Sequence, residues 1–238
     1  MKVQQNLLPD KPPRVEGLDI AGTCIYCDET GGDYYDFLQF PELGEGKIAF
    51  AVGDVAGHGI SPALLMTTVR AMIRTRVLQA GSLAQVTEDV NRLLCRDTER
   101  SGDFMTLFLA LLDSAGRDLS WVRAGHTPAI VYDLATDVFE ELTGEGVALG
   151  FDDDATFTDY RYRDWNSTKL LFMGTDGVWE TENPEGEQFG TERLETVLRQ
   201  HCRSSSEQIV QAVLDALDEF RFGRNPEDDI TLVVVRAR

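Results

Sequence analysis

Hydrophobic positions follow two different periods along this chain. Short apolar runs, rich in β-branched and aromatic residues, alternate with longer stretches in which apolar residues recur with a helical period. The short runs predict strands over residues 18–26, 34–40, 47–52, 104–113, 119–124, 129–132, 156–163, 169–175 and 230–236. The longer stretches predict helices over residues 61–79, 191–201 and 205–220, and one more that begins at Ser82.

The predicted helices carry recognisable start signals. Ser82 followed by Gln85, and Ser205 followed by Gln208, match the capping box, in which side chains and backbone N–H groups bond reciprocally. Ser61 before a proline predicts a further N-cap. The apolar stripes of these helices are more typical of core packing than of a cofactor site.

The order of the elements indicates the fold class. Groups of strands alternate with pairs of helices, rather than strictly one strand with one helix, which is typical of α+β proteins. We therefore expect two packed, mainly antiparallel β-sheets flanked by helix pairs. The length favours one domain. Residues 1–16 are polar and broken by prolines, so they are expected to be a linker or helix end before a domain over residues 17–238.

Composition limits the class of partner and the compartment. The net charge of −19 argues against nucleic acid or an anionic membrane as a partner. No apolar run reaches the ~18 residues of a membrane span, and no leader is evident, so we expect a cytoplasmic protein. Cys24 and Cys27 form a C-x-x-C pair, but a zinc or redox site would want a second pair or nearby histidines, which favours reduced thiols.

Acidic residues beside glycines mark several predicted strand ends. Residues 53–66 read GDVAGHGISPALLM, in which three glycines follow a strand and precede a helix. Further clusters are GGDYYD at 31–36, GTDG at 174–177 and DDIT at 228–231. Carboxylates from several strand ends can converge on hard divalent cations, which prefer oxygen ligands. The alternative for each aspartate alone is a turn or capping residue exposed to solvent.

Taken together, these motifs resemble a known family. The segments that carry the resemblance are VQQNLLP (3–9), GGDYYDF (31–37), GDVAGHG (53–59), ALLM (63–66), FMTLFLALLD (104–113), AGHTP (124–128), GVALG (146–150), TDGVWE (175–180) and DDITLVVV (228–235). In order and spacing they resemble the bacterial stage-II-sporulation-E and sigma-B-regulator type of serine phosphatase, within the metal-dependent protein phosphatase 2C superfamily. The resemblance implies the same sandwich of two sheets between helix pairs.

The resemblance also implies a site with two divalent cations, Mn²⁺ or Mg²⁺, which activate a bridging water. Asp54 matches the carboxylate that bridges the two ions, and the carbonyl of Val55 lies beside it. Asp33 matches a ligand of the second ion. Asp176 and Asp228 match ligands of the first ion.

Other polar residues near these motifs have less certain roles. Asp36 has the opposite strand parity from Asp33, so both cannot point inward on a regular strand. Asp229 is expected to form hydrogen bonds rather than bind metal directly. His58 is a possible proton donor, although its spacing from Asp54 departs from the eukaryotic pattern, and ordering of the loop is the favoured interpretation. His126 is expected to be structural.

The resemblance also departs from the eukaryotic pattern in substrate binding. The arginine with which eukaryotic members hold the substrate phosphate has no clear counterpart here. Residues 177–190 are long and acidic for a connector, and they resemble a flap beside the substrate site, with Trp179 either in the flap or in the core.

The resemblance implies a protein serine/threonine phosphatase. Its expected substrate is a phosphorylated regulatory protein of the anti-sigma-factor-antagonist type, and an upstream sensor or receiver domain is expected to precede it in the full-length chain. The alternative is a catalytically silent adaptor that keeps the fold and binds a signalling partner. A calcium-binding module is disfavoured because the twelve-residue loop pattern is lacking.

Overall fold

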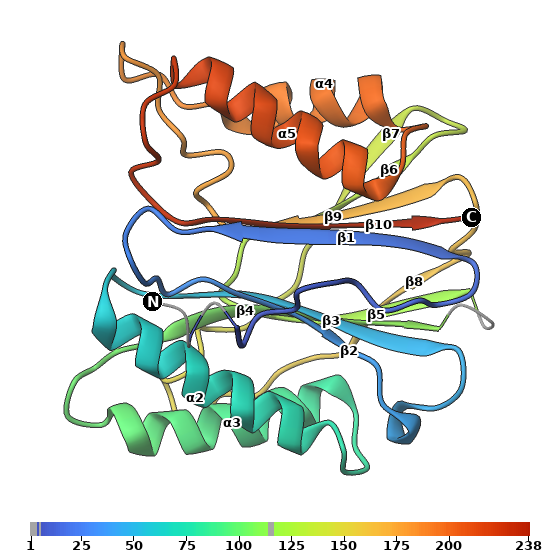
Figure 1. Cartoon of the computed structure of the whole chain (residues 1–238). Coiled ribbons are helices and arrows are strands. Elements are labelled where there is room, and N and C mark those ends of the chain that lie inside the picture. The colour runs from blue at the N-terminus through green and yellow to red at the C-terminus, as the bar shows by residue number, and fades with distance from the viewer. Residues whose placement is uncertain (1–3, 5, 114–116) are drawn as a thin grey trace.

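Two β-sheets pack face to face, and a pair of helices covers the outer face of each (Figure 1). The structure is a computed structural model that describes residue 4, residues 6–113 and residues 117–238. This architecture confirms the α+β sandwich predicted from the sequence. The linker or helix end predicted over residues 1–16 lies partly outside the described residues.

Every strand pairing within the two sheets is antiparallel. The first sheet has the order β1 (Leu18–Ile25), β10 (Ile230–Ala237), β9 (Lys169–Gly174), β6 (Ala129–Asp133) and β7 (Val138–Leu142). The second has the order β2 (Tyr34–Leu38), β3 (Lys47–Val55), β4 (Met105–Asp113), β5 (Asp118–Ala124) and β8 (Tyr160–Arg163). The helices are α2 (Ile60–Arg76), α3 (Leu83–Thr98), α4 (Gly190–His201) and α5 (Ser206–Phe220), with a short 3-10 turn, η1, at Pro41–Leu43.

Buried apolar side chains form three layers. The layer between the sheets includes Phe50, Phe108 and Val233. A second lies between α2, α3 and the second sheet, and a third between α4, α5 and the first sheet. Because strand residues alternate between faces, each sheet contributes to the central layer and to one helix-covered layer. The polar residues that matter for function are therefore placed at the ends of the strands.

The starts of the helices agree with the sequence in two cases out of three. Both capping boxes form, with Ser82 before α3 and Ser205 before α5. The predicted cap at Ser61 is wrong, because α2 already begins at Ile60 and its N-cap is Gly59, without a side-chain hydrogen bond. Gly59 has φ 91°, a conformation that favours glycine and lets the chain enter the helix directly from the loop.

The observed strands differ from the predicted ones in two places. Strand β7 was not predicted, and its residues are mostly exposed because it lies at the edge of its sheet. The strand expected over residues 156–163 is shorter, and only Tyr160–Arg163 pairs with β5. Neither change affects the edge of the sandwich where the acidic residues lie.

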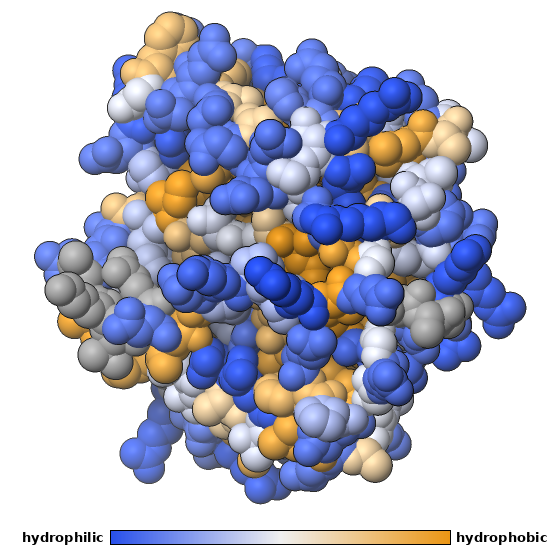
Figure 2. Space-filling model, turned by 45° about the vertical axis from the view of Figure 1, so that its right-hand side comes forward, coloured by the Kyte–Doolittle hydropathy of each residue, from blue (hydrophilic) through white to orange (hydrophobic). Residues whose placement is uncertain are grey.

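The surface agrees with the acidic composition. Figure 2 shows a face on which hydrophilic side chains predominate, with hydrophobic ones gathered mainly near its middle. Within the described part of the chain, no helix has both the length and the apolar character needed to cross a membrane.

Candidate metal centre

Strand register brings the predicted acidic residues to one end of the sandwich. In the second sheet Tyr34 pairs with Gly53, so the chain positions next to them, Asp33 and Asp54, lie opposite each other. In the first sheet Gly174 pairs with Leu232, so Asp176 follows the end of β9 beside the start of β10. Residues from both sheets thus meet at the same edge.

Electrostatic coupling shows that these carboxylates are close neighbours. Burial and the charges of Asp176, Asp228 and Asp229 together raise the pKa of Asp54 to about 8, although a hydrogen bond with Asp33 opposes the rise. Burial and the charge of Asp54 likewise hold the pKa of Asp33 well above its usual range. The pKa of Asp228 is raised as well, by burial and by the charge of Asp176.

Asp33 is fully enclosed between the sheets. Its side chain is buried, and its Oδ2 accepts a hydrogen bond of 2.8 Å from the hydroxyl of Thr175. The same hydroxyl accepts a bond of 3.1 Å from the backbone N–H of Thr231. Asp33 in the second sheet is therefore linked through Thr175 to both strands of the first sheet that carry the site.

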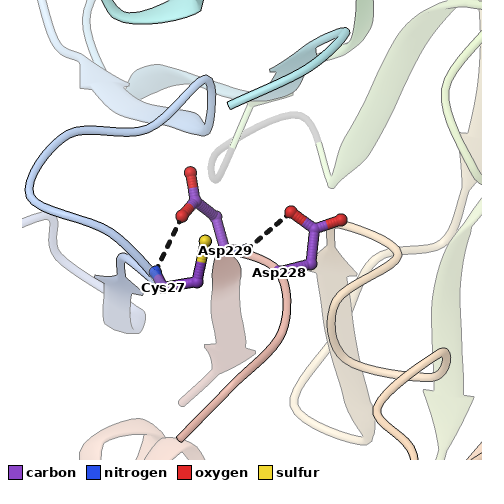
Figure 3. A group of neighbouring side chains, drawn as sticks. All are labelled: Cys27, Asp228 and Asp229. Carbon is purple, nitrogen blue, oxygen red and sulfur yellow. Dashed lines mark hydrogen bonds between the residues drawn. The ribbon is translucent and has the colours of Figure 1, made fainter. Parts of the chain in front are cut away.

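Asp229 is also buried, beside the loop that precedes Asp33. Its Oδ1 accepts a hydrogen bond of 2.9 Å from the backbone N–H of Cys27, and its own N–H donates to Oδ1 of Asp228 at 2.8 Å. Figure 3 shows the three side chains gathered at the start of β10. These contacts give Asp229 the hydrogen-bonding role that the sequence favoured.

Three glycines allow the loops of the site to approach one another. A Cβ on Gly31 would lie 1.7 Å from Oδ2 of Asp229, and one on Gly177 would lie 2.0 Å from the carbonyl oxygen of Asp229. A Cβ on Gly32 would lie 2.5 Å from the carbonyl oxygen of Val55. No larger residue fits these positions without displacing the chain that carries the acidic side chains.

The donor set fits hard divalent cations. After burial, the groups that shift the pKa of Asp54 most are the carboxylates of Asp176, Asp228, Asp229 and Asp33. Oxygen donors of this kind suit Mg²⁺ and Mn²⁺. Among the described residues, the group with three ligand atoms within 4.8 Å of one another is Cys27, Asp228 and Asp229. Burial and Asp229 raise the pKa of the Cys27 thiol to about 12, so the thiol stays protonated near neutral pH. Because a metal ion binds the thiolate, this group is not a favourable site for a soft metal ion.

Comparison with known proteins agrees with this geometry. The family model described as Stage II sporulation protein E (SpoIIE) matches residues 44–238. The chain belongs to the SpoIIE family. It is 30% identical over 99% of its length to Phosphoserine phosphatase RsbU of Bacillus subtilis, of which it covers 68%. The family resemblance stated from the sequence is confirmed, and with it the class of enzyme, a protein serine phosphatase.

Two more comparisons define how far the similarity extends. The SiaA-PP2C domain of Pseudomonas aeruginosa has the same fold, with a TM-score of 0.83, 23% identity and coverage of 100% of this chain and 94% of that one. Protein IcfG of Synechocystis is 26% identical over 98% of this chain, but the chain spans only 40% of it. The similarity to IcfG thus covers one part of a longer protein.

Asp36 is not part of this SpoIIE-family centre. It lies on the helix-covered side of β2, where both carboxylate oxygens accept bonds from Arg74, at 2.6 and 2.8 Å, and Tyr34 donates at 3.1 Å. The possible ligand role for Asp36 is therefore wrong. The parity argument from the sequence anticipated this, but nothing in the sequence identified Arg74 as the partner.

The two histidines near the centre occupy different environments. His58 is exposed, and its Nδ1 lies 3.1 Å from Oδ2 of Asp28, a contact between two loops at the rim. His126 is buried, with Nε2 donating to the carbonyl of Gly174 at 3.1 Å and Nδ1 accepting from Thr106 at 2.8 Å. The first contact fits a loop-ordering role, and the second is the structural role expected for His126.

The connector over residues 177–190 borders a cavity next to the centre. A cavity of about 270 Å³ separates it from the chain between α5 and β10, and Asp228 is among the lining residues. Trp179 is half-buried against the core beneath α4 and α5, so it anchors the connector rather than projecting into the cavity.

Proposed function

We propose that this chain is a phosphatase that depends on divalent metal ions and hydrolyses phosphoserine or phosphothreonine on a regulatory partner protein. The observation that carries the proposal is the convergence of Asp33, Asp54, Asp176 and Asp228 from both sheets, where burial and the charges of neighbouring carboxylates raise the pKa values of Asp33, Asp54 and Asp228. Two bound cations would lower the pKa of a water molecule and neutralise the phosphate charge.

Each residue has a distinct task in this proposal. Asp54, Asp176, Asp228 and the carbonyl of Val55 would bind the cations, with Asp33 as a further ligand. Asp33 is oriented by Thr175. Asp229 fixes the loop before Asp33 through its bond with Cys27.

The proposed substrate is a phosphorylated protein of the anti-sigma-factor-antagonist type. Similarity to RsbU over nearly the whole chain supports a place in a partner-switching system. The strongly acidic composition agrees with recognition of a protein rather than of nucleic acid.

We also propose that the chain is the output domain of a longer signalling protein with an upstream sensor or receiver domain. The relatives extend beyond the region that it matches. The amide of Gln4 donates a buried hydrogen bond of 2.7 Å to the carbonyl of Gly31, in the loop that leads to Asp33. A movement of the N-terminal segment would therefore displace Gly31, which lies two residues before the proposed ligand Asp33.

The activity is tested with p-nitrophenyl phosphate and a phosphoserine protein. We expect hydrolysis to stop after EDTA treatment and to return with Mn²⁺, less well with Mg²⁺ or Ca²⁺. Zinc is disfavoured because the proposed ligands are all oxygen atoms, with no cysteine or histidine among them. Full turnover after exhaustive EDTA treatment would contradict the metal dependence. A protein that binds the partner but hydrolyses neither substrate at saturating Mn²⁺ would be the silent adaptor instead.

The output role is tested by fusing the N-terminus to a rigid dimeric coiled coil in each of the seven heptad registers. Activity should vary with register, because the upstream helix would set the position of Gln4 and the loop at Gly31. The Gln4→Ala variant should lose much of this variation. Equal activity in all registers and in the unfused chain would show that the segment carries no signal.

A further inference from the structure

Arg221 is a buried cation without adequate partners beside the metal centre. It follows the last turn of α5, and its side chain is 12% exposed. One amino group, Nη2, lies 3.3 Å from Oδ1 of Asp218. Nε and Nη1 are buried without a hydrogen-bond partner among the described residues. A buried guanidinium with free donors is costly unless an acceptor is bound.

Arg221 also lines a cavity next to the centre. It has a volume of about 270 Å³ and lies between the connector after β9 and the chain that leads to β10. Arg221 and Arg224 line it on one side, Thr181 and Gln188 on the other, and Asp228 lines it as well. A group held in this cavity is therefore next to a proposed metal ligand, and so next to the reacting phosphate.

The acidic lining of the cavity restricts where an anion could bind to the two arginines. The chain has a net charge of −19, and Glu180, Glu182 and Glu227 line the same cavity. An anion would be repelled from most of this rim, and only the guanidinium groups offer it paired donors in a planar arrangement. Cations bound at Asp228 would offset part of the remaining negative charge.

We infer that Arg221 and Arg224 form an oxyanion subsite that receives an acidic group of the substrate protein beside the phosphoserine. The inference rests on the proposed phosphatase function and extends it to substrate selection. The chemistry accepts either a carboxylate or a second phosphate, since both present oxygens to the guanidinium donors. This subsite gives an anchor to an enzyme that lacks the phosphate-binding arginine of the eukaryotic pattern.

The test compares phosphoserine peptides that differ only near the phosphoserine. One set carries a flanking aspartate or glutamate, a second carries asparagine or glutamine, and a third carries a second phosphoserine. The wild-type protein should show a kcat/KM for acidic peptides about tenfold or more above that for neutral ones, the effect of one charge-assisted hydrogen bond. The kcat/KM for the doubly phosphorylated peptides, compared with that for the acidic peptides, shows whether a phosphate or a carboxylate is preferred.

Substitutions of the two arginines test whether they cause the preference for acidic peptides. Arg221→Gln and Arg224→Gln should reduce the ratio towards one, whereas Arg96→Gln, an exposed arginine on α3, should keep it. Arg221→Glu should favour peptides with a flanking lysine. If Arg221→Gln does not fold, as judged by thermal unfolding, Arg221→Lys and Arg224→Gln serve in its place. A wild-type ratio near one, or a ratio unchanged in the folded variants, would overturn the subsite.

A binding measurement separates this inference from the proposed function. Fluorescence anisotropy with the same peptides, in the presence of Mn²⁺, gives the ratio of affinities without requiring turnover. If neither p-nitrophenyl phosphate nor any peptide is hydrolysed, the proposed function fails, while the affinity ratio still decides the subsite. A preference for acidic peptides that Arg221→Gln abolishes would support the subsite in either case.

Discussion

His126 and Thr106 are joined by a hydrogen bond of 2.8 Å between the ring Nδ1 and the hydroxyl oxygen. Thr106 pairs directly with Asp54 in the second sheet. The opposite ring nitrogen of His126 donates to the carbonyl of Gly174, at the end of β9 in the first sheet. One neutral imidazole thus connects the two sheets at the strand ends that carry Asp54 and Asp176.

This position predicts a pH-dependent contribution of His126 to stability. Burial lowers the pKa of His126 to about 4 from its ordinary 6.5, so between these values the unfolded state binds more protons than the folded state. The free energy of unfolding contributed by His126 should therefore be complete above pH 6.5 and decline as the pH falls towards 4, by about 3 kcal/mol in total.

Denaturant unfolding of the wild type and His126→Gln measures this effect. Because the site carboxylates also titrate, the relevant quantity is the difference in stability between the two proteins at each pH. That difference should be larger at pH 7 than at pH 4.5. A difference that does not change with pH would show that the buried imidazole is not the source.

Removal of one site carboxylate should separate activity from stability. In Asp54→Asn or Asp176→Asn, activity at saturating Mn²⁺ should fall by ~100-fold or more, because a proposed metal ligand loses its charge. Without metal, both variants should be at least as stable as the wild type, since one source of repulsion is gone. Wild-type activity in either variant would contradict the assignment of the ligand.

The raised pKa of Asp54 adds a pH dependence to the same experiment. Since the folded-state pKa is about 8, against an ordinary 3.8, the folded metal-free protein binds more protons than the unfolded chain between these values. Its stability should decrease as the pH rises through this range, and Asp54→Asn should remove that part of the slope. Thermal unfolding in EDTA at pH 5 and pH 8 measures the change.

Gly31→Ala should damage the centre without touching a proposed ligand. The new Cβ would lie 1.7 Å from Oδ2 of Asp229 and 2.4 Å from a ring carbon of Tyr26, so the loop before Asp33 must move. We expect activity to fall roughly 10- to 100-fold, together with weaker activation by Mn²⁺. Metal titrations of the activity provide the measurement.

Gly102→Ala is the matched control for that substitution. Unlike Gly31, Gly102 has a positive φ, of 71°, and a Cβ there would meet nothing within 4 Å. It should cost about 1 kcal/mol of stability through backbone strain and leave the activation by Mn²⁺ unchanged. Equal effects of the two substitutions on activity would show that the contact with Asp229 is unimportant.

The buried ion pair between Arg74 and Asp36 should be important for stability alone. Arg74→Met leaves the Asp36 carboxylate buried without its main partner and should cost about 3–5 kcal/mol in the free energy of unfolding. Activity per folded molecule should remain, because Asp36 faces α2 and not the metal centre. Urea unfolding and activity measured on the same samples test both statements.

Arg199→Met is the control for the ion pair. Arg199 pairs with Asp137 at 2.7 Å and stacks on Phe139 much as Arg74 stacks on Phe40, but the Asp137 side chain is 60% exposed. Arg199→Met should cost much less stability than Arg74→Met, because solvent screens the exposed pair. Similar costs for both substitutions would contradict the importance of burial for Asp36.

The order and class of most elements, and the acidic motifs, can be predicted from the amino-acid pattern alone. The spacing of hydrophobic residues separates strands from helices. Side chains on one face recur every two residues in a strand and every 3.6 residues in a helix. The capping boxes at Ser82 and Ser205 are equally local, since their partners lie three residues away. The aspartates stand out because glycines beside strand ends are rare outside turns and close contacts.

Which of these residues meet depends on the folded arrangement of the two sheets. The hydrogen bond of Thr175 with Asp33 joins residues 142 positions apart, and that of Cys27 with Asp229 joins residues 202 apart. Local patterns carry no information on such pairs, which depend on how the two sheets stack and on strand register. For the same reason the partner of Asp36, the link through His126 and the buried guanidinium of Arg221 became visible only in the folded chain.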